Sequence, residues 1–310
     1  MNESPPPPLV LAPVALPGAP LVRMLRLVAV DAAPVLLAST TYSATPPLRT
    51  EIQALPLAGS GPSGLVATVG QLLPVPPRWD AAVGAGGKLS FVVELAGGAL
   101  NALFQTDGTT DHRSSLTAHH PFGSFSAPRF VRDAGAAQPA VTAVLDDATA
   151  VLLDHATPPE HPIAACNDLV ITTGSSGATA VCKRYAPGAS RGGALPGSAS
   201  VFALDPAHRA AGAEIAPFGE RRIFELDADA SGGDLVIVAT AGAHLLLAHR
   251  KAEGAAFQTL QVDPGGASPQ AFSSPCVVIT GRTVTLAVLS RALTPDARVL
   301  VATWPLDALP

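Results

Sequence analysis

Residues 235–262, LVIVATAGAHLLLAHRKAEGAAFQTLQV, decide the fold. They contain three short runs rich in apolar residues, 235–240, 244–250 and 257–262, separated by turns rich in Gly, Ala and charged residues. Runs of this length and composition predict β-strands joined as hairpins. The run Leu235–Val238 is apolar at every position, which is typical of a strand whose sheet is covered on both faces.

The same pattern recurs on both sides of this stretch. Further hairpins are predicted for 35–42 with 48–57, 89–96 with 100–106, 140–145 with 150–155, 178–185 with 198–204, and 283–290 with 298–304. Another strand precedes most of them, over 25–30, 129–132, 169–173, 223–226 and 276–280. The hairpin centres are separated on average by roughly 50 residues. The chain therefore predicts six units of three to four strands each.

A single sheet of this composition has two apolar faces and can bury them only against other sheets. Units of this size resemble the blades of the β-propeller superfamily over nearly the whole chain. The resemblance rests on strand spacing and not on a family motif, since Trp79-Asp80 is the only Trp-Asp pair and a WD40 protein would repeat it. It implies an all-β, six-bladed propeller with four-stranded blades. A β-sandwich-rich all-β fold is the alternative, because sandwiches have similar strand spacing.

The N-terminal residues 1–8 include four consecutive prolines and predict an extended, disordered tail before a single domain, residues 9–310. The apolar run 9–22 is interrupted by Pro13, Pro17 and Pro20, and no basic residue precedes it. These features favour neither a signal peptide nor a membrane span. We therefore expect a soluble, cytoplasmic protein.

Composition narrows the classes of partner. Only 14% of the 310 residues are charged, 48% are apolar, and the net charge is −5. The few basic residues are dispersed, so we expect no nucleic-acid partner. Cys166, Cys182 and Cys276 are widely separated, which favours reduced core residues over a disulfide framework or a zinc site.

One candidate metal site is the acidic stretch 227–234, DADASGGD. Alternating carboxylates with a glycine at the sixth place resemble the first half of an EF-hand loop, which would bind Ca²⁺. The candidate ligands are Asp227, Asp229, Ser231 and Asp234. An EF-hand would have Glu at the twelfth place, where this chain has Val238, so an acidic turn between strands is the alternative.

A second candidate is the most polar stretch of the chain, in a predicted loop between two units. Its imidazoles and carboxylates could bind a metal or transfer protons. The candidate residues are Asp107, Asp111, His112, His119 and His120. A solvated loop is the alternative, because no His-Glu-x-x-His helix motif is present.

Function is the least determined property. No complete catalytic motif is found, so no catalytic or cofactor-binding residue is assigned, and Ca²⁺ is the only cofactor considered. The primary hypothesis is a non-catalytic scaffold that binds another protein, because a surface with so few charges should expose apolar patches. The alternatives are a carbohydrate-binding or carbohydrate-active propeller, similar to a lectin or a glycosidase, and a small metal-dependent hydrolase that uses residues 107–120 or residues 227–234.

Overall fold

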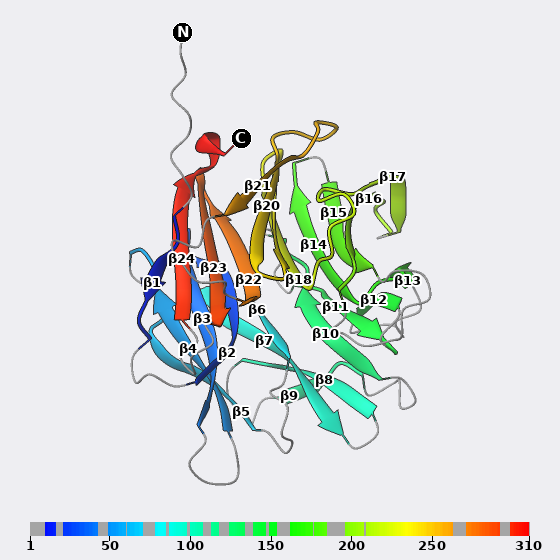
Figure 1. Ribbon diagram of the computed structural model, residues 1–310. Coiled ribbons are helices and arrows are strands. Elements are labelled where there is room, and N and C mark those ends of the chain that lie inside the picture. Colours follow the sequence, from blue (N-terminus) through cyan, green and yellow to red (C-terminus); the bar gives the residue numbers. More distant parts are fainter. Residues whose placement is uncertain are drawn as a thin grey trace.

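The computed structural model confirms the six predicted units as six four-stranded antiparallel sheets (Figure 1). It describes residues 10–16, 21–42, 49–59, 61–70, 78–84, 87–97, 100–107, 113–117, 124–133, 139–146, 149–153, 162–175, 177–184, 196–207, 209–262, 271–291 and 298–309. The sheets are arranged as the blades of a propeller, so the sandwich alternative is excluded. The predicted tail, residues 1–8, lies outside the described residues.

Each blade is one continuous antiparallel meander, except for the sixth. Blade one consists of β2 (Leu21–Val30), β3 (Ala33–Tyr42), β4 (Arg49–Pro56) and β5 (Gly64–Gly70). Blade two consists of β6 (Trp79–Val83), β7 (Leu89–Gly97), β8 (Leu100–Thr106) and β9 (Arg113–Ser115). Blade three consists of β10 (Phe125–Phe130), β11 (Val141–Leu145), β12 (Thr149–Leu153) and β13 (Pro162–Ala164).

The second half of the chain continues the pattern. Blade four consists of β14 (Asp168–Gly174), β15 (Gly177–Arg184), β16 (Ser198–Leu204) and β17 (Ala210–Ile215). Blade five consists of β18 (Glu225–Ser231), β19 (Asp234–Ala241), β20 (His244–Arg250) and β21 (Gln258–Val262). Blade six consists of β22 (Ala271–Thr280), β23 (Thr283–Arg291), β24 (Arg298–Pro305) and β1 (Ala12–Val14).

The ring is closed by the two ends of the chain. β1 pairs with β24, with Ala12 opposite Val301 and Val14 opposite Val299, so the N-terminal segment completes the last blade. In Figure 1 the blue β1 lies beside the red β24. The first strand of each blade contacts the first strand of the next, and β22 contacts β2. These six first strands (β2, β6, β10, β14, β18 and β22) therefore surround one axis.

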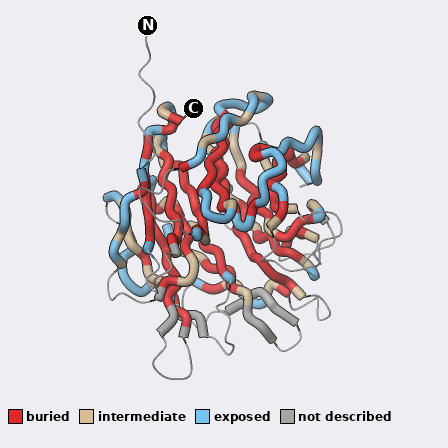
Figure 2. The backbone as a smooth tube through the Cα atoms, viewed as in Figure 1, coloured by how far each residue is buried: buried red, intermediate tan, exposed pale blue. Residues whose placement is uncertain are grey.

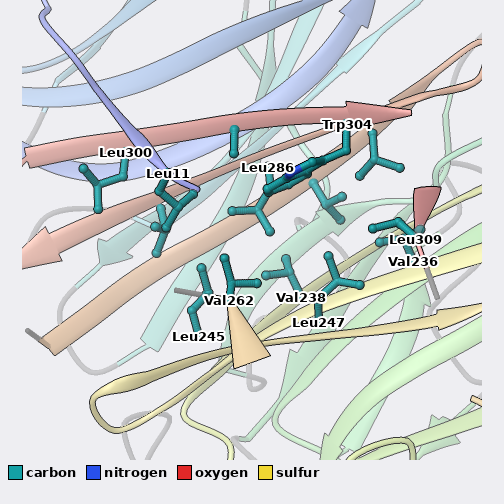
Figure 3. Packing of buried hydrophobic residues seen from close by; sticks show 14 of the residues in the cluster. Leu11, Val236, Val238, Leu245, Leu247, Val262, Leu286, Leu300, Trp304 and Leu309 are labelled. Atoms are coloured by element: carbon teal, nitrogen blue, oxygen red, sulfur yellow. The ribbon is translucent and has the colours of Figure 1, made fainter. Parts of the chain in front are cut away.

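The core lies between neighbouring blades. Between blades five and six, Val238 and Leu247 face Leu286 and Trp304 (Figure 3). Leu11, just before β1, is only 4% exposed and packs into the same cluster. Buried residues follow the inner strands of the blades, and exposed residues gather in the connections and on outer strands such as β17 and β21 (Figure 2). The apolar faces that one blade cannot bury alone are thus covered by its neighbours.

Helices contribute little to the fold. The described residues contain no α-helix. A 3-10 turn, η2 (Leu306–Ala308), follows the last strand. Within these same ranges no helix is long and apolar enough to cross a membrane.

Candidate ligand site at the propeller axis

Buried charged residues on the first strands form a layer across the axis. Arg26 on β2 is paired with Asp80 on β6, with 2.8 Å between Nε and Oδ1. Arg129 on β10 donates to both carboxylate oxygens of Asp168 on β14, each at 3.2 Å. Because all four side chains are nearly buried, these pairs are held in a medium of low effective dielectric constant.

Asp227 on β18 is the centre of this charged layer, and its side chain is fully buried. Arg132, which follows β10, binds both of its carboxylate oxygens, at 2.7 and 2.8 Å. Arg129 Nη1 lies 3.7 Å from Asp227 Oδ1. Two arginines of blade three therefore balance the negative charge of Asp227, although blade four lies between blade three and blade five.

Carboxylates of one blade also bind the backbone of the next. Asp80 Oδ2 accepts the N–H of Phe130 at 2.8 Å, Asp227 Oδ2 accepts that of Val277 at 3.0 Å, and Asp229 Oδ2 accepts that of Ile279 at 2.7 Å. In each pair the two residues are 50 positions apart. One edge of each first strand pairs with no other strand of its sheet. These carboxylates accept hydrogen bonds from backbone N–H groups on that edge.

Two first strands carry the same bulge at the level of the charged layer. Ala127 on β10 and Ser274 on β22 have positive φ values, 48° and 53°, and the strand register shifts at both. The N–H of Ala127 donates to Glu94 Oε2 at 3.2 Å, and that of Ser274 donates to Glu225 Oε2. The bulges bend the starts of these strands, as bulges commonly do beside functional sites.

A cavity of about 390 Å³ opens above the charged layer, where the first strands begin. We call it the axial pocket. All six blades contribute to its lining, which includes the side chains Arg23, Arg26, Arg78, Arg129, Asn167, Asp168, Lys183, Glu225 and Ser273. This volume is within the range of about 300–1,000 Å³ that is usual for small-molecule sites.

Several polar atoms of this lining are buried and have no hydrogen-bond partner. They are Arg23 Nε, Arg129 Nη1, both side-chain atoms Oδ1 and Nδ2 of Asn167, and Ser273 Oγ. Asn167 is 3% exposed and Arg129 is 6% exposed. An unsatisfied buried polar group costs about 1–3 kcal/mol. An ordered water or a bound polar ligand would supply the missing partners, so their concentration around one cavity makes it a candidate ligand site.

The charges around the pocket change the pKa of two of its groups. Burial by itself would raise the pKa of Asp168, but the charge and hydrogen bonds of Arg129, with Lys183 and Arg26, lower it below its usual value. Burial lowers the pKa of Lys183, and the positive charges of Arg78 and Arg129 lower it further, against the opposite effect of Asp168 and Glu225. Asp168 is thus held as a carboxylate.

A second cavity, of about 600 Å³, lies where the first strands end. Most residues of its lining are apolar, with Arg132, Asp133 and Asp229 as the charged side chains, and polar and apolar atoms contribute equally to its surface. Burial raises the pKa of Asp229, against the lowering effect of Arg132 and the N–H of Ile279. Asp227 separates the two cavities, because it lines neither and pairs with Arg129 of one and Arg132 of the other.

The predicted calcium ligands are divided among three places. Asp227 is in the axial ion pairs, and Asp229 and Ser231 line the second cavity. Asp234 instead contacts His249 Nε2 and Arg282 Nη1, both at 2.9 Å. In the described part of the chain, no group of three or more His, Cys, Asp or Glu side chains could hold a metal ion. Calcium binding by this stretch stays a prediction.

The second predicted site falls mostly outside the described residues. Asp111, His112, His119 and His120 lie there, and Asp107 is described as an exposed residue after β8. The protein-binding surface gains little support, because the large exposed hydrophobic residues in the described ranges are few. They are Val10, Leu65, Ile215 and Phe224, from different parts of the chain.

Sequence reasoning missed the residues of the axial pocket, although two signals were present. One is a charged residue inside an apolar first strand, such as Arg26 within LVRMLRLVAV. The other is a repeat, FSAPRFV at residues 125–131 and FSSPCVV at residues 272–278, which contains both bulges. Bulged strand starts in two of six units would have directed attention to this end of the axis.

Three comparisons agree on the fold. A GH93 α-L-arabinofuranosidase of Fusarium graminearum, solved with arabinobiose, gives a TM-score of 0.59 at 10% identity, covering 97% of this chain and 98% of that one. The PQQ-bound aldose sugar dehydrogenase from Streptomyces coelicolor gives 0.58 at 9% identity, with 97% and 100% covered. A protein of unknown function from Dyadobacter fermentans gives 0.62 at 9% identity, with 94% and 97% covered.

The likeness is confined to structure. No family model matches the chain, and no curated protein matches it in sequence. At such low identity the comparisons show that the chain shares the six-bladed propeller fold, and fold alone does not determine function.

Proposed function

We propose that this propeller binds a small carbohydrate in the axial pocket. The observation that carries the proposal is the set of buried, unpartnered polar atoms on Arg23, Arg129, Asn167 and Ser273, which line one cavity between all six blades. A sugar presents hydroxyl groups that both donate and accept hydrogen bonds. The side chain of Asn167 has an NH₂ group that donates and an oxygen that accepts. The arginines donate, and the hydroxyl of Ser273 can do both.

The structural neighbours support a sugar over other small polar molecules. Two of the three are sugar-active proteins by name, one of them solved with a disaccharide. They perform different reactions, so the neighbours support a ligand class and not a chemistry. This support is an analogy of fold and is weaker than the geometry of the pocket itself.

The proposal is for binding, without catalysis. Glycoside hydrolysis uses a pair of carboxyl groups, one of which is commonly a protonated acid with a raised pKa. Of the two carboxylates in the axial pocket, Asp168 has a lowered pKa and both oxygens bound to Arg129. Glu225 binds the N–H of the bulged Ser274. Both carboxylates are engaged in holding the site together.

Asn167→Leu tests this function. The amide of Asn167 is buried without a partner, so its replacement by an apolar residue of similar size should leave the unliganded protein as stable as before, or more stable. The same change should weaken sugar binding about tenfold or more, because a ligand hydroxyl loses its partner. Calorimetric titration with a panel of mono- and disaccharides that includes arabinobiose measures the affinity, and thermal unfolding measures the stability.

Ser231→Ala is the matched control, because Ser231 lines the second cavity. It should leave sugar affinity unchanged. Binding that resists Asn167→Leu, or a panel in which no sugar binds, contradicts the proposed function.

A further inference from the structure

We infer that the sugar bound in the axial pocket carries a negative charge, as a uronic acid or a sugar phosphate does. This inference rests on the proposed function and names its ligand class. Its basis is the imbalance of charge around the cavity. Five cationic side chains line it, Arg23, Arg26, Arg78, Arg129 and Lys183, against two carboxylates, Asp168 and Glu225.

Part of this positive charge is already balanced within the protein. Arg26 is paired with Asp80 below the pocket, and Arg129 is paired with Asp168. These two guanidinium groups belong to the charged layer that forms the pocket floor. Arg129 Nη1 also lies 3.7 Å from Asp227 Oδ1, so neither guanidinium group leaves unbalanced charge for a ligand.

The excess positive charge comes from Arg23, Arg78 and Lys183. Arg23 has a buried Nε without a partner, and Arg78 is exposed at the pocket rim, just before β6. Among the described residues, neither arginine is part of an ion pair. Lys183 donates from Nζ to the carbonyl of Phe224 at 2.5 Å. Asp168 and Glu225 both offset the charge of Lys183, so Arg23 and Arg78 are the cations of the lining that no ion pair among the described residues balances.

These cations are also close enough to disfavour one another. Burial lowers the pKa of Lys183, and the positive charges of Arg78 and Arg129 lower it further, against the raising effects of Asp168 and Glu225. A neutral sugar would leave this repulsion in place, whereas an anionic group bound among the three cations would relieve it. Guanidinium groups bind carboxylates and phosphates through two parallel hydrogen bonds, and such charge-assisted bonds are about twice as strong as neutral ones.

The pocket thus divides its lining by chemistry. Arg23, Arg78 and Lys183 are suited to the anionic group. Asn167 and Ser273, which are neutral, are suited to the hydroxyls of the sugar ring. Recognition of the charge and of the ring can therefore be measured separately.

Matched ligands make the first comparison. D-glucuronate and D-glucose differ in carrying a carboxylate or a hydroxymethyl group at C6, and glucose 6-phosphate carries a phosphate there. Calorimetric titrations of the full chain at low and moderate salt should show D-glucuronate, glucose 6-phosphate or both binding about tenfold or more tightly than D-glucose. The acidic sugar that binds more tightly then identifies the anionic group. The preference should decrease with added salt.

Variants of the cations make the second comparison. Arg78→Met removes an exposed charge at the rim and should remove most of the preference for the acidic sugar, while the affinity for D-glucose stays within about twofold. Arg23→Met should act in the same direction. Arg222→Met is the control, because Arg222 is an exposed arginine in the connection between β17 and β18 and does not line the axial pocket. It should leave the preference unchanged.

The two failures are distinguishable. If D-glucose binds as tightly as both acidic sugars, the anionic ligand is excluded and the carbohydrate site stands. Inorganic phosphate is the second reference ligand. If it binds as tightly as the acidic sugars, and D-glucose does not bind, the sugar ring adds no affinity. Both the inference and the proposed function are then overturned. A preference that survives Arg78→Met and Arg23→Met together also overturns the inference.

Discussion

At the scale of single residues, the axis combines satisfied and unsatisfied polar groups. The ion pairs of Asp168 and Asp227 are buried and geometrically good, and they join blade three to blade four and to blade five. Directly above them, Asn167 and Ser273 have polar atoms without partners. Buried charge with good partners holds the floor of the pocket in place, and buried polarity without partners is available to a ligand.

The importance of the floor can be measured at Arg132. Arg132→Met leaves the fully buried carboxylate of Asp227 without its principal partner, which should reduce the free energy of unfolding by about 3–5 kcal/mol. Arg209→Met is the matched control, since Arg209 forms an exposed pair with Asp205 and the loss of this pair should change the free energy of unfolding little. Urea denaturation of both variants gives the comparison. Equal small losses would show that the axial pair is not structurally important.

Residue partners in this layer could not be predicted from the sequence. Arg26 and Asp80 are 54 positions apart, and Arg132 and Asp227 are 95 positions apart. Nothing local to Arg26 specifies which carboxylate it meets, because the pairing follows from the order and number of blades around the axis. The sequence likewise predicted that Asp227 and Asp234 belong to one loop. They lie on the two strands of the first hairpin of blade five, where Asp227 pairs with Arg132 and Asp234 contacts His249.

At the scale of elements, strand positions were readable because each blade repeats the same local signals. The predicted runs 235–240, 244–250 and 257–262 correspond to β19, β20 and β21 within one or two residues. Apolar runs and turn residues are local properties, so they predict strands well. Closure by β1 was not predicted, since three residues interrupted by Pro13 give no strand signal of their own.

Closure can be tested at two adjacent residues that precede β1. Leu11 is buried in the cluster between blades five and six, whereas Val10 is 56% exposed. Leu11→Asp should lower the melting temperature by several degrees, because it places a charge in an apolar core. Val10→Asp should change it by little. Thermal unfolding of the two variants measures this, and similar melting temperatures would contradict closure through this segment.

At the scale of the whole molecule, each of the six blades buries its apolar faces against its neighbours, and all six meet at the axis. The first strands supply charged residues at the axis, and their starts supply the basic pocket. The overall charge of the chain is −5, so the positive lining is a local feature that composition could not predict. A site at the common axis can draw on every blade, and its lining can change while the blades keep their packing.

The central claim is that a ligand occupies the axial pocket, and a crystal structure of the protein grown with saturating D-glucuronate tests it most directly. The account predicts density for the sugar at the starts of the first strands, with its carboxylate within hydrogen-bond distance of Arg23 or Arg78 and its ring against Asn167. Density for the sugar in the second cavity or on the outer strands, with the axial pocket filled only by water, would contradict it.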